Sequence, residues 1–333
     1  MRTRLLTASD IAKIIHMEDV LEAVEGAFRE YGMGKAIMPP KLYLTMGQYN
    51  GDFRAMPAYV ESSAGLKWVS VYPDNPKKDL PTVMALVIYS DPETGFPLAI
   101  MDATKLTNYR TGAAGGIAAK YLARPDARTL GLIGAGAQAK TQLLAVTHYF
   151  SFLKILVWSP VEEQIEDMKN DYPELPIEKA TIAEAAACDI ICTTTPVRGF
   201  IIKREWIKPG THINAIGADA AGKQELDPQI LRDAKVIVDD ITQAKHSGEI
   251  NVAVKKGLFS ESDIYSTLGE IVTGAKKGRT ADEITVFDST GLAIQDVATA
   301  RMLFEKAKRE GIGHEFDVVG EDNVRVDGEN PEN

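Results

Sequence analysis

A glycine-rich turn lies in the middle of this chain, at Thr129-Leu-Gly-Leu-Ile-Gly-Ala-Gly-Ala-Gln-Ala139. A short apolar run leads into Gly-x-Gly-x-x-Ala, the pattern of a strand-to-helix turn that accommodates a dinucleotide pyrophosphate. Gly134 permits the tight turn, Gly136 lets a phosphate approach bare backbone, and Ala139 keeps the following helix close to the strand. By itself the pattern also fits a tight connection in any α/β protein. Its position predicts a substantial segment in front of a nucleotide-binding fold.

The spacing of apolar runs after the turn favours the nucleotide-binding fold. Short runs recur at intervals most of which can hold a helix, over residues 130–133, 155–157, 189–193, 212–216, 236–239 and 285–287. Alternating strands and helices predict an α/β fold with a parallel, doubly wound sheet of Rossmann type. A last helix is expected over 292–310, with its N-cap at Ser289 or Thr290, and we expect it to return to the N-terminal part of the chain.

The segment before the turn has a different pattern. Val20, Val24, Phe28 and Tyr31 mark one face of an amphipathic helix within residues 9–31. Strands are then expected over 42–44, 66–71, 82–89 and 96–101. The last two are joined by a turn that contains Pro and Gly. This pattern predicts an antiparallel sheet with a helix, separate from the nucleotide fold.

Composition excludes several classes of protein. With 333 residues, 45% of them hydrophobic, the chain can bury a large core and favours two domains. A net charge of −10 without a basic run gives no surface for nucleic acid. No apolar run approaches the roughly 20 residues that span a bilayer, and the N-terminus lacks a signal-peptide core, so we expect a cytoplasmic protein with no membrane partner. Cys188 and Cys192 have no companions at metal-ligand spacing, so we interpret them as core thiols and expect no metal.

Three cations before the glycine turn are candidates for chemistry. Arg54, Lys67 and Arg110 each stand beside apolar, strand-like or Gly-rich sequence. Arginine forks bind a carboxylate bidentately, and a lysine in apolar surroundings can lose its proton near neutral pH and act as base or acid. Taken singly, each residue also fits an ordinary surface charge. Trp68 alternates to the opposite face of the strand from Lys67, and we expect it in the core.

The end of the second expected strand leaves the dinucleotide open. An acidic residue usually accepts the ribose hydroxyls of NAD at this point, and here the strand ends at Ser159. Ser159 can hydrogen-bond either a hydroxyl or a 2′-phosphate, and Glu162 or Glu163 can reach the ribose. No arginine lies close by. NAD is the expected cofactor, and NADP is not excluded.

Several motifs together resemble the ornithine cyclodeaminase/mu-crystallin family, and within it the archaeal alanine dehydrogenase branch. The resemblance extends to about Gly313. It rests on Arg54-Ala-Met-Pro, Leu66-Lys-Trp-Val, Leu80-Pro-Thr-Val-Met-Ala-Leu, Thr94-Gly-Phe-Pro-Leu-Ala, Met101-Asp-Ala-Thr, Arg110-Thr-Gly-Ala-Ala-Gly-Gly, Gly134-Ala-Gly-Ala-Gln-Ala, Asn214-Ala-Ile-Gly-Ala-Asp, Gly222-Lys-Gln-Glu-Leu, Ala244-Lys-His-Ser-Gly-Glu-Ile-Asn-Val-Ala-Val and Phe287-Asp-Ser-Thr-Gly-Leu-Ala-Ile-Gln-Asp. There are two departures, because the family commonly has Pro where this chain has Ala221 and Asp where it has Ser159.

The resemblance implies an organisation into domains and a homodimer. A substrate-binding and dimerisation domain of α+β type would span residues 1–118 and be completed by 291–314. The Rossmann domain would span 119–290, and an acidic tail, expected to be flexible, would span 315–333.

The resemblance also implies roles for individual residues. Arg54, Lys67 and Arg110 would contact the substrate, with Thr290 near its side chain, and Lys67 and Asp219 would be catalytic, with Asp219 facing the substrate amine. The cofactor contacts, which include the glycines of the turn, would be Thr82, Arg110, Thr111, Gly134, Gly136, Ala137, Gln138, Ser159, Thr193, Asn214, Ala215, Ile216, Lys223 and Ser289.

The implied reaction is NAD-dependent oxidative deamination of L-alanine. A hydride would leave Cα for the nicotinamide, Lys67 or Asp219 would take the amine proton, and water would hydrolyse the imine to pyruvate and ammonia. Ornithine cyclodeamination and reduction of a cyclic ketimine are alternatives within the family. A non-catalytic, crystallin-like dinucleotide binder is an alternative of another class, which would not need the set of Arg54, Lys67, Arg110 and Asp219.

Three further features have structural interpretations. His212 lies in an apolar strand, where a hydrogen-bonded core imidazole is expected. The glycines over 112–116 fit either close helix packing or a phosphate loop. His246 near Glu249 suggests either a proton relay or an interface loop.

Overall fold

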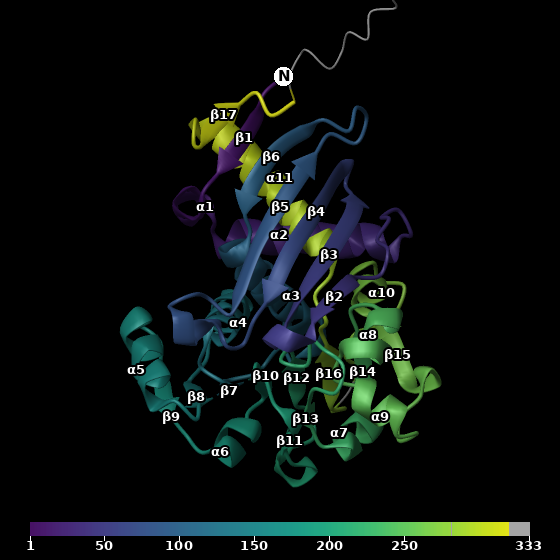
Figure 1. Ribbon diagram of the computed structural model, residues 1–333. Coiled ribbons are helices and arrows are strands. Elements are labelled where there is room, and N and C mark those ends of the chain that lie inside the picture. The colour runs from purple at the N-terminus through teal and green to yellow at the C-terminus, as the bar shows by residue number, and fades with distance from the viewer. Residues whose placement is uncertain (281, 320–333) are drawn as a thin grey trace, which may run out of the picture.

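Two large sheets organise the chain, whose computed structural model describes residues 1–280 and 282–319 (Figure 1). A seven-stranded sheet has the order β17-β1-β6-β5-β4-β3-β2, and an eight-stranded sheet has the order β15-β14-β16-β12-β10-β7-β8-β9. The sheets occupy opposite halves of the molecule in Figure 1. The predicted α/β fold is therefore confirmed.

The seven-stranded sheet combines strands from both ends of the chain. All its neighbouring pairs are antiparallel except β1 with β6. Its strands are β1 (Thr3–Leu6), β2 (Leu42–Met46), β3 (Gly51–Val60), β4 (Ser63–Val71), β5 (Val83–Ser90), β6 (Pro97–Asp102) and β17 (His314–Phe316). The four predicted strands are β2, β4, β5 and β6. The long strand β3, which lies next to the edge strand β2, was not predicted, because Gly51, Asp52 and Pro57 weaken its strand pattern.

Four helices accompany this sheet, namely α1 (Ala8–Ile14), α2 (Met17–Gly32), α3 (Thr104–Leu122) and α11 (Ala293–Glu310). The single helix predicted over 9–31 is wrong, because Ile15 and His16 adopt extended backbone between α1 and α2. As predicted, α11 returns to the N-terminal part, where it packs on α2 and along one face of β3, β4 and β5 (Figure 1). Its N-cap is Leu292, so the predicted cap at Ser289 or Thr290 is wrong.

The eight-stranded sheet is parallel throughout. The six predicted runs correspond to β7 (Thr129–Ile133), β8 (Lys154–Trp158), β10 (Ile190–Thr193), β12 (His212–Ala215), β14 (Lys235–Val238) and β16 (Thr285–Asp288). Two edge strands extend it, β9 (Ile177–Lys179) and β15 (Ile264–Thr267). The strand order reverses at β7, between β8 and β10, which is where doubly wound sheets bind ligands at their carboxyl edge.

Shorter elements complete the parallel half. Its helices are α4 (Ala137–Tyr149), α5 (Glu162–Asp171), α6 (Ile182–Ala186), α7 (Pro228–Asp233), α8 (Ile241–Ser247), α9 (Asn251–Lys255) and α10 (Leu268–Val272). Strands β11 (Arg198–Ile202) and β13 (Gln224–Leu226) form a small parallel pair. Short 3-10 helices lie at Gly47–Tyr49, Asn75–Lys78, Arg204–Trp206 and Glu261–Asp263.

The glycines over 112–116 hold the two halves together rather than forming a phosphate loop. They lie inside α3, which packs closely on α4. A Cβ at Gly112 would lie 2.4 Å from the carbonyl oxygen of Thr141, and one at Gly116 would lie 2.8 Å from Ala145. Only glycine permits this approach of two helix backbones.

Two predictions about the periphery need correction. Trp68 is 40% exposed and stacks on Phe53, so its assignment to the core is wrong. It lies on the face of the sheet opposite α11. The predicted tail also begins too early, since Glu315 and Phe316 belong to β17, which pairs with β1. Residues 320–333 lie outside the described residues.

The buried histidine and cysteines follow expectation. His212 is fully buried, with Nδ1 at 2.9 Å from Thr285 Oγ1 and Nε2 at 3.0 Å from Asn214 Oδ1. Burial lowers the pKa of His212 to about 3, so the imidazole is neutral. Cys188 and Cys192 are buried free thiols. Within residues 1–280 and 282–319, no helix is long and apolar enough to cross a bilayer. The cytoplasmic location stays a prediction.

Candidate active site

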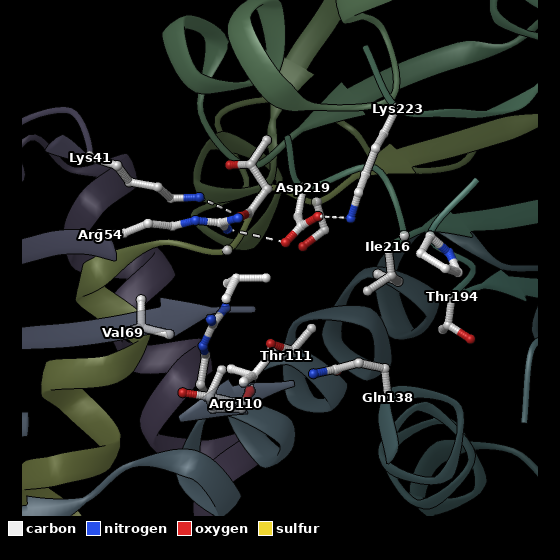
Figure 2. Close-up of a pocket in the computed structure, with 18 of the residues that line it drawn as sticks. Lys41, Arg54, Val69, Arg110, Thr111, Gln138, Thr194, Ile216, Asp219 and Lys223 are labelled. Atoms are coloured by element: carbon white, nitrogen blue, oxygen red, sulfur yellow. Dashed lines mark hydrogen bonds and ion pairs between the residues drawn. The ribbon is translucent and has the colours of Figure 1, made fainter. Parts of the chain in front are cut away.

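A cavity of about 220 Å³ lies between the seven-stranded sheet and the carboxyl ends of the parallel strands. Its lining on one side comes from β3, β4, β5 and α3, and on the other from the segments that follow β7, β10, β12 and β16. Figure 2 shows Lys41, Arg54, Asp219 and Lys223 along one side of it, with Arg110, Thr111 and Gln138 on the other. Arg54, Lys67, Arg110, Asp219 and Thr290, which sequence reasoning assigned to substrate or catalysis, all line this cavity.

Lys67 and Arg110 share one carboxylate at the base of the cavity. Lys67 Nζ lies 2.7 Å from Asp296 Oδ2, and Arg110 Nε donates to Asp296 Oδ1 at 2.9 Å. Arg110 Nη1 also donates to Gln295 Oε1 at 2.9 Å. Burial and the Arg110 cation lower the pKa of Lys67 to about 7, although Asp296 opposes the shift. Lys67 can therefore exchange a proton near neutral pH.

Asp296 was not predicted from the sequence to be a site residue. It lies in the first turn of α11 and is fully buried. The sequence did hold a signal for Asp296, because it lies on the apolar face of a helix that was expected to return to the first domain. Burying an unpaired carboxylate there would cost stability, so an acid at this position indicates a buried partner.

Arg54 bridges two acids from different halves of the molecule. Arg54 Nε donates to Asp52 Oδ1 at 2.7 Å on its own strand, and Nη1 donates to Asp219 Oδ2 at 3.1 Å beyond β12 (Figure 2). The guanidinium carbon lies 5.3 Å from the centre of the Tyr43 ring, a cation–π contact that further fixes its plane. Lys223 Nζ donates to the other oxygen of Asp219 at 2.5 Å.

These contacts decide the charge of Asp219. Burial raises its pKa, but the cations of Lys223 and Arg54 lower it by more, and the net pKa lies well below the ordinary value. Asp219 is therefore an ionised hydrogen-bond acceptor at neutral pH and a poor proton acceptor.

Lys41 is a further cavity cation that sequence reasoning missed. It lies just before β2, and its Nζ donates to the carbonyl oxygen of Thr290 at 2.5 Å (Figure 2). Removal from solvent lowers the pKa of Lys41 to about 8, with Asp239 opposing the shift. Like Arg54 and Lys67, Lys41 stands beside an apolar strand sequence, so the same criterion could have found it.

The glycine turn has the geometry that a dinucleotide pyrophosphate requires. Gly134 has φ +108°, and a Cβ there would lie 2.4 Å from Thr194 Oγ1. Gly136 instead faces open space, since a Cβ on this residue would have no described atom within 4 Å. It caps the N-terminus of α4, whose free N–H groups favour an anion. Two buried polar atoms, Gln138 Oε1 and Ser289 Oγ, have no hydrogen-bond partner among the described residues. These features fit NAD or NADP.

The predicted cofactor residues divide into two groups. Those that line the cavity are Arg110, Thr111, Gln138, Ile216, Lys223 and Ser289. Those outside its lining are Thr82, Gly134, Gly136, Ala137, Ser159, Thr193, Asn214 and Ala215. Gly134, Gly136 and Ala137 form the turn just described, and Ser159 Oγ accepts a hydrogen bond from Val161 N at 3.1 Å after β8.

The side chains of Thr193 and Asn214 do not face the cavity and instead hydrogen-bond to other parts of the protein. Thr193 Oγ1 donates to Glu225 Oε2 at 2.6 Å, and Asn214 Nδ2 donates to the carbonyl oxygen of Gly115 at 2.9 Å. Both residues are fully buried. The threonines that line the cavity are the next two, Thr194 and Thr195. Side-chain contact with a cofactor is therefore not supported for Thr193 or Asn214.

The fold and the site define a Rossmann-type dinucleotide-binding protein with a cation-lined cavity beside the nucleotide turn. The chain belongs to the ornithine cyclodeaminase/mu-crystallin family, whose family model matches residues 1–311. The resemblance inferred from its motifs is therefore confirmed.

Two relatives and two solved structures illustrate the range of similarity. The chain is 52% identical over 316 residues to alanine dehydrogenase of Archaeoglobus fulgidus, covering 94% of this chain and 98% of the relative. It is 35% identical over 324 residues to Delta(1)-pyrroline-2-carboxylate reductase of Bacillus cereus, covering 94% and 99%.

Among solved structures, an archaeal alanine dehydrogenase dimer with bound NAD matches with a TM-score of 0.93 and 50% identity, covering 96% of this chain and 100% of that one. Delta(1)-pyrroline-2-carboxylate reductase of Thermococcus litoralis, in complex with NADH and L-proline, matches with a TM-score of 0.90 and 41% identity, covering 94% and 99%.

Proposed function

We propose that this protein catalyses the reversible, NAD(H)-dependent oxidative deamination of L-alanine to pyruvate and ammonia. The observation that carries the proposal is Lys67, a buried amine with a pKa of about 7 in a cavity bordered by the nucleotide-binding segments. The choice of alanine over other amino acids is supported by 52% identity to an alanine dehydrogenase along nearly the whole chain.

Cations of the cavity would bind and orient the carboxylate of the substrate. Arg54 is held from behind by Asp52, and Arg110 Nε and Nη1 are held by Asp296 and Gln295. These bonds leave Arg110 Nη2 available to a ligand. A guanidinium fixed in this way binds a carboxylate at a low entropic cost.

Lys67 would accept the proton that the substrate amine must lose. Bound NAD supplies the chemistry of oxidation by accepting a hydride from Cα. The neutral amine gives up its electron pair to form the Cα=N bond, water adds to Cα, and the C–N bond then breaks to release ammonia and pyruvate. Lys67 in its neutral form is suited to take a proton from the amine and, after passing it on, from the attacking water.

Asp219 is proposed to orient groups and not to accept a proton. Its carboxylate is held ionised between Arg54 and Lys223. A negative charge in this position favours the protonated amine or the positively charged imine during binding. Of the two proton acceptors that sequence reasoning allowed, the geometry therefore favours Lys67.

NAD is proposed as the cofactor. The turn at Gly134 and Gly136, the N-terminus of α4, Gln138 and Ser289 would hold it. Solved relatives contain NAD or NADH, and the first turn of α5 after Ser159 is acidic, at Glu162 and Glu163, which disfavours a 2′-phosphate.

We further propose a homodimer formed across the open face of the seven-stranded sheet. Along β5, Ala85, Val87 and Tyr89 are buried, whereas the intervening Met84, Leu86 and Ile88 are 36%, 51% and 40% exposed. Apolar residues on both faces of a strand indicate that both faces become covered. The NAD-bound alanine dehydrogenase similar to this chain is a dimer. The domain boundaries at 118 and 290 remain part of the same proposal.

An assay of NADH oxidation tests this function. Pyruvate with ammonia is expected to oxidise NADH, with little turnover when ammonia is omitted or NADPH replaces NADH. Pyrroline-2-carboxylate is the alternative substrate, because relatives at 35% and 41% identity are reductases of that compound. Preferential oxidation of NADH by pyrroline-2-carboxylate, or formation of proline from ornithine with no net change in cofactor, would overturn the proposal.

A further inference from the structure

Asp239, a fully buried acid outside the proposed reaction, binds one loop at the edge of the cavity. It follows β14, and its carboxylate accepts hydrogen bonds from three donor groups of the segment that follows β16. Asp239 Oδ2 accepts from Thr290 N at 2.6 Å and from Gly291 N at 2.8 Å, and Oδ1 accepts from Thr290 Oγ1 at 2.9 Å.

The same loop contacts two of the cations in the cavity. The carbonyl oxygen of Thr290 accepts from Lys41 Nζ at 2.5 Å. Gly291 has φ +75°, and a Cβ there would lie 2.3 Å from Arg110 Nη1, so the loop backbone lies directly against the guanidinium. Lys41 and Arg110 come from the N-terminal half of the chain, whereas the loop and Asp239 come from the parallel half.

We propose that Asp239 is a positioning residue that holds the Thr290–Gly291 backbone where it seats Lys41 and Arg110 for binding of the carboxylate substrate. The identity of the substrate in this proposal rests on the proposed function, whereas the proposed effect of Asp239 on the position of the loop is independent of that function. Ser289 is anchored separately, since its N–H donates to the carbonyl oxygen of Ala215 at 3.0 Å. Asp239 should therefore affect the carboxylate end of the cavity more than the cofactor end.

Charged and titratable groups surround Asp239 on each packed element. They are Lys41 before β2, Asp288 at the end of β16, Asp240 at the N-cap of α8, and Tyr31 of α2, whose hydroxyl donates to Asp240. Burial raises the pKa of Asp239 to about 6, while Lys41 and the bonds from the loop oppose the shift. As pH falls through about 6, protonation removes the negative charge of the Asp239 carboxylate and weakens its hydrogen bonds to Thr290 and Gly291. The KM for the carboxylate substrate should therefore rise below about pH 6.

The test compares Asp239→Asn with Asp240→Asn, an adjacent substitution of the same type that leaves the loop contacts intact. In Asp239→Asn, the KM for pyruvate should rise about tenfold through weaker charge-assisted bonds, and the acid rise in KM should disappear. The Kd for NADH should stay within about twofold, because Ser289 keeps its own anchor. Asp240→Asn should resemble the wild type. An unchanged KM for pyruvate in Asp239→Asn, or an acid rise that persists there, would overturn the proposal.

Hydrogen exchange provides a second readout that needs no turnover. In the protein without added ligand, Asp239→Asn should speed amide exchange in a peptide that contains Thr290 and Gly291, and Asp240→Asn should not. If Asp239→Asn does not fold, Thr290→Val removes one of the three donor groups of the loop that bind Asp239, and it should speed exchange by less. Unchanged exchange at Gly291 in the folded variant would contradict the positioning role. Absence of wild-type turnover would contradict only the proposed function, because the exchange comparison would still decide the role of Asp239.

Discussion

Lys67 and Asp296 form an ion pair inside the protein, with Lys67 Nζ 2.7 Å from Asp296 Oδ2 and side chains that are 1% and 0% exposed. The pair joins β4 to the helix that returns from the far end of the chain. Arg110 binds the second oxygen of the same carboxylate, so one acid serves two cations of different proposed roles.

The first prediction concerns the pH dependence of turnover. Burial and Arg110 hold the pKa of Lys67 near 7, so the amine is neutral above this pH and protonated below it. The kcat/KM for alanine oxidation should therefore rise with pH and level off above about 7, and amination of pyruvate should lose activity over the same range. Lys67→Arg keeps the charge but cannot release a proton, and should reduce turnover by at least about a hundredfold with NADH binding retained. A Lys67→Arg variant with wild-type turnover would remove Lys67 from the mechanism.

Asp296→Asn should affect both stability and the pH profile. Removing the charge leaves Lys67 and Arg110 without their shared buried acid, and the free energy of unfolding should fall by about 3 kcal/mol. Because Asp296 raises the pKa of Lys67, its loss should move the rise in alanine oxidation to lower pH. Urea denaturation and a pH series of kcat/KM measure the two effects. A profile that stays in place would show that Asp296 does not control Lys67.

Arg54→Lys tests the need for a planar guanidinium between Asp52 and Asp219. Lysine keeps the charge but cannot hold both acids in a fixed plane, so the KM for pyruvate should rise about tenfold. The Kd for NADH should be unchanged. Arg301→Lys is a matched control, because Arg301 is 44% exposed and pairs with Glu61 on the surface. Equal kinetics in the two variants would argue against substrate contact by Arg54.

Alanine substitutions of the two glycines of the nucleotide turn should have different effects, one on stability and the other on NADH binding. Gly134→Ala places a methyl group 2.4 Å from Thr194 Oγ1 on a backbone with φ +108°, and should destabilise the fold by more than about 1 kcal/mol. Gly136→Ala faces open space at φ −78°, so Tm should barely change. Its methyl group would occupy space expected for the pyrophosphate, and the Kd for NADH should rise at least about tenfold. Wild-type NADH affinity in Gly136→Ala would place the pyrophosphate elsewhere.

Leu86→Asp tests the proposed dimer. A charge in the middle of the open apolar face should be costly to bury, and sedimentation velocity should show a monomer. Leu153→Asp is the control, since Leu153 is 77% exposed in the connection between β7 and β8. A Leu86→Asp protein that sediments as the wild type does would locate any subunit interface on another surface.

Local patterns in the sequence predicted much of the fold. The six strands of the parallel sheet were predictable because buried parallel strands are short apolar runs at βα spacing. The convergence of Arg54, Lys67 and Arg110 on one cavity was implied by the family resemblance, because each residue taken singly also fitted an ordinary surface charge. The exposure of Trp68 was not predictable from alternation, which separates two faces without showing which one the chain itself covers.

The residues that were missed depend on contacts between distant segments. Asp296 meets Lys67 across more than 200 positions, and Asp239 meets Thr290 across 51. Neither contact can be predicted from the spacing of residues within a short segment of the sequence. Thr193 shows a related limit, because the sequence does not tell which of the consecutive Thr193, Thr194 and Thr195 face the cavity.

Transfer of deuterium tests the central claim most directly. NADH would carry deuterium in place of the C4 hydrogen that is transferred as hydride. Its reaction with pyruvate and ammonia should yield L-alanine with deuterium at Cα, which NMR can detect. Lys67→Arg should yield almost none. Deuterium in lactate, or in no product at all, would contradict the claim that this cavity presents Cα of alanine to the nicotinamide. The claim would also be contradicted if, with pyrroline-2-carboxylate added as a competing substrate, deuterium appeared in proline in preference to alanine.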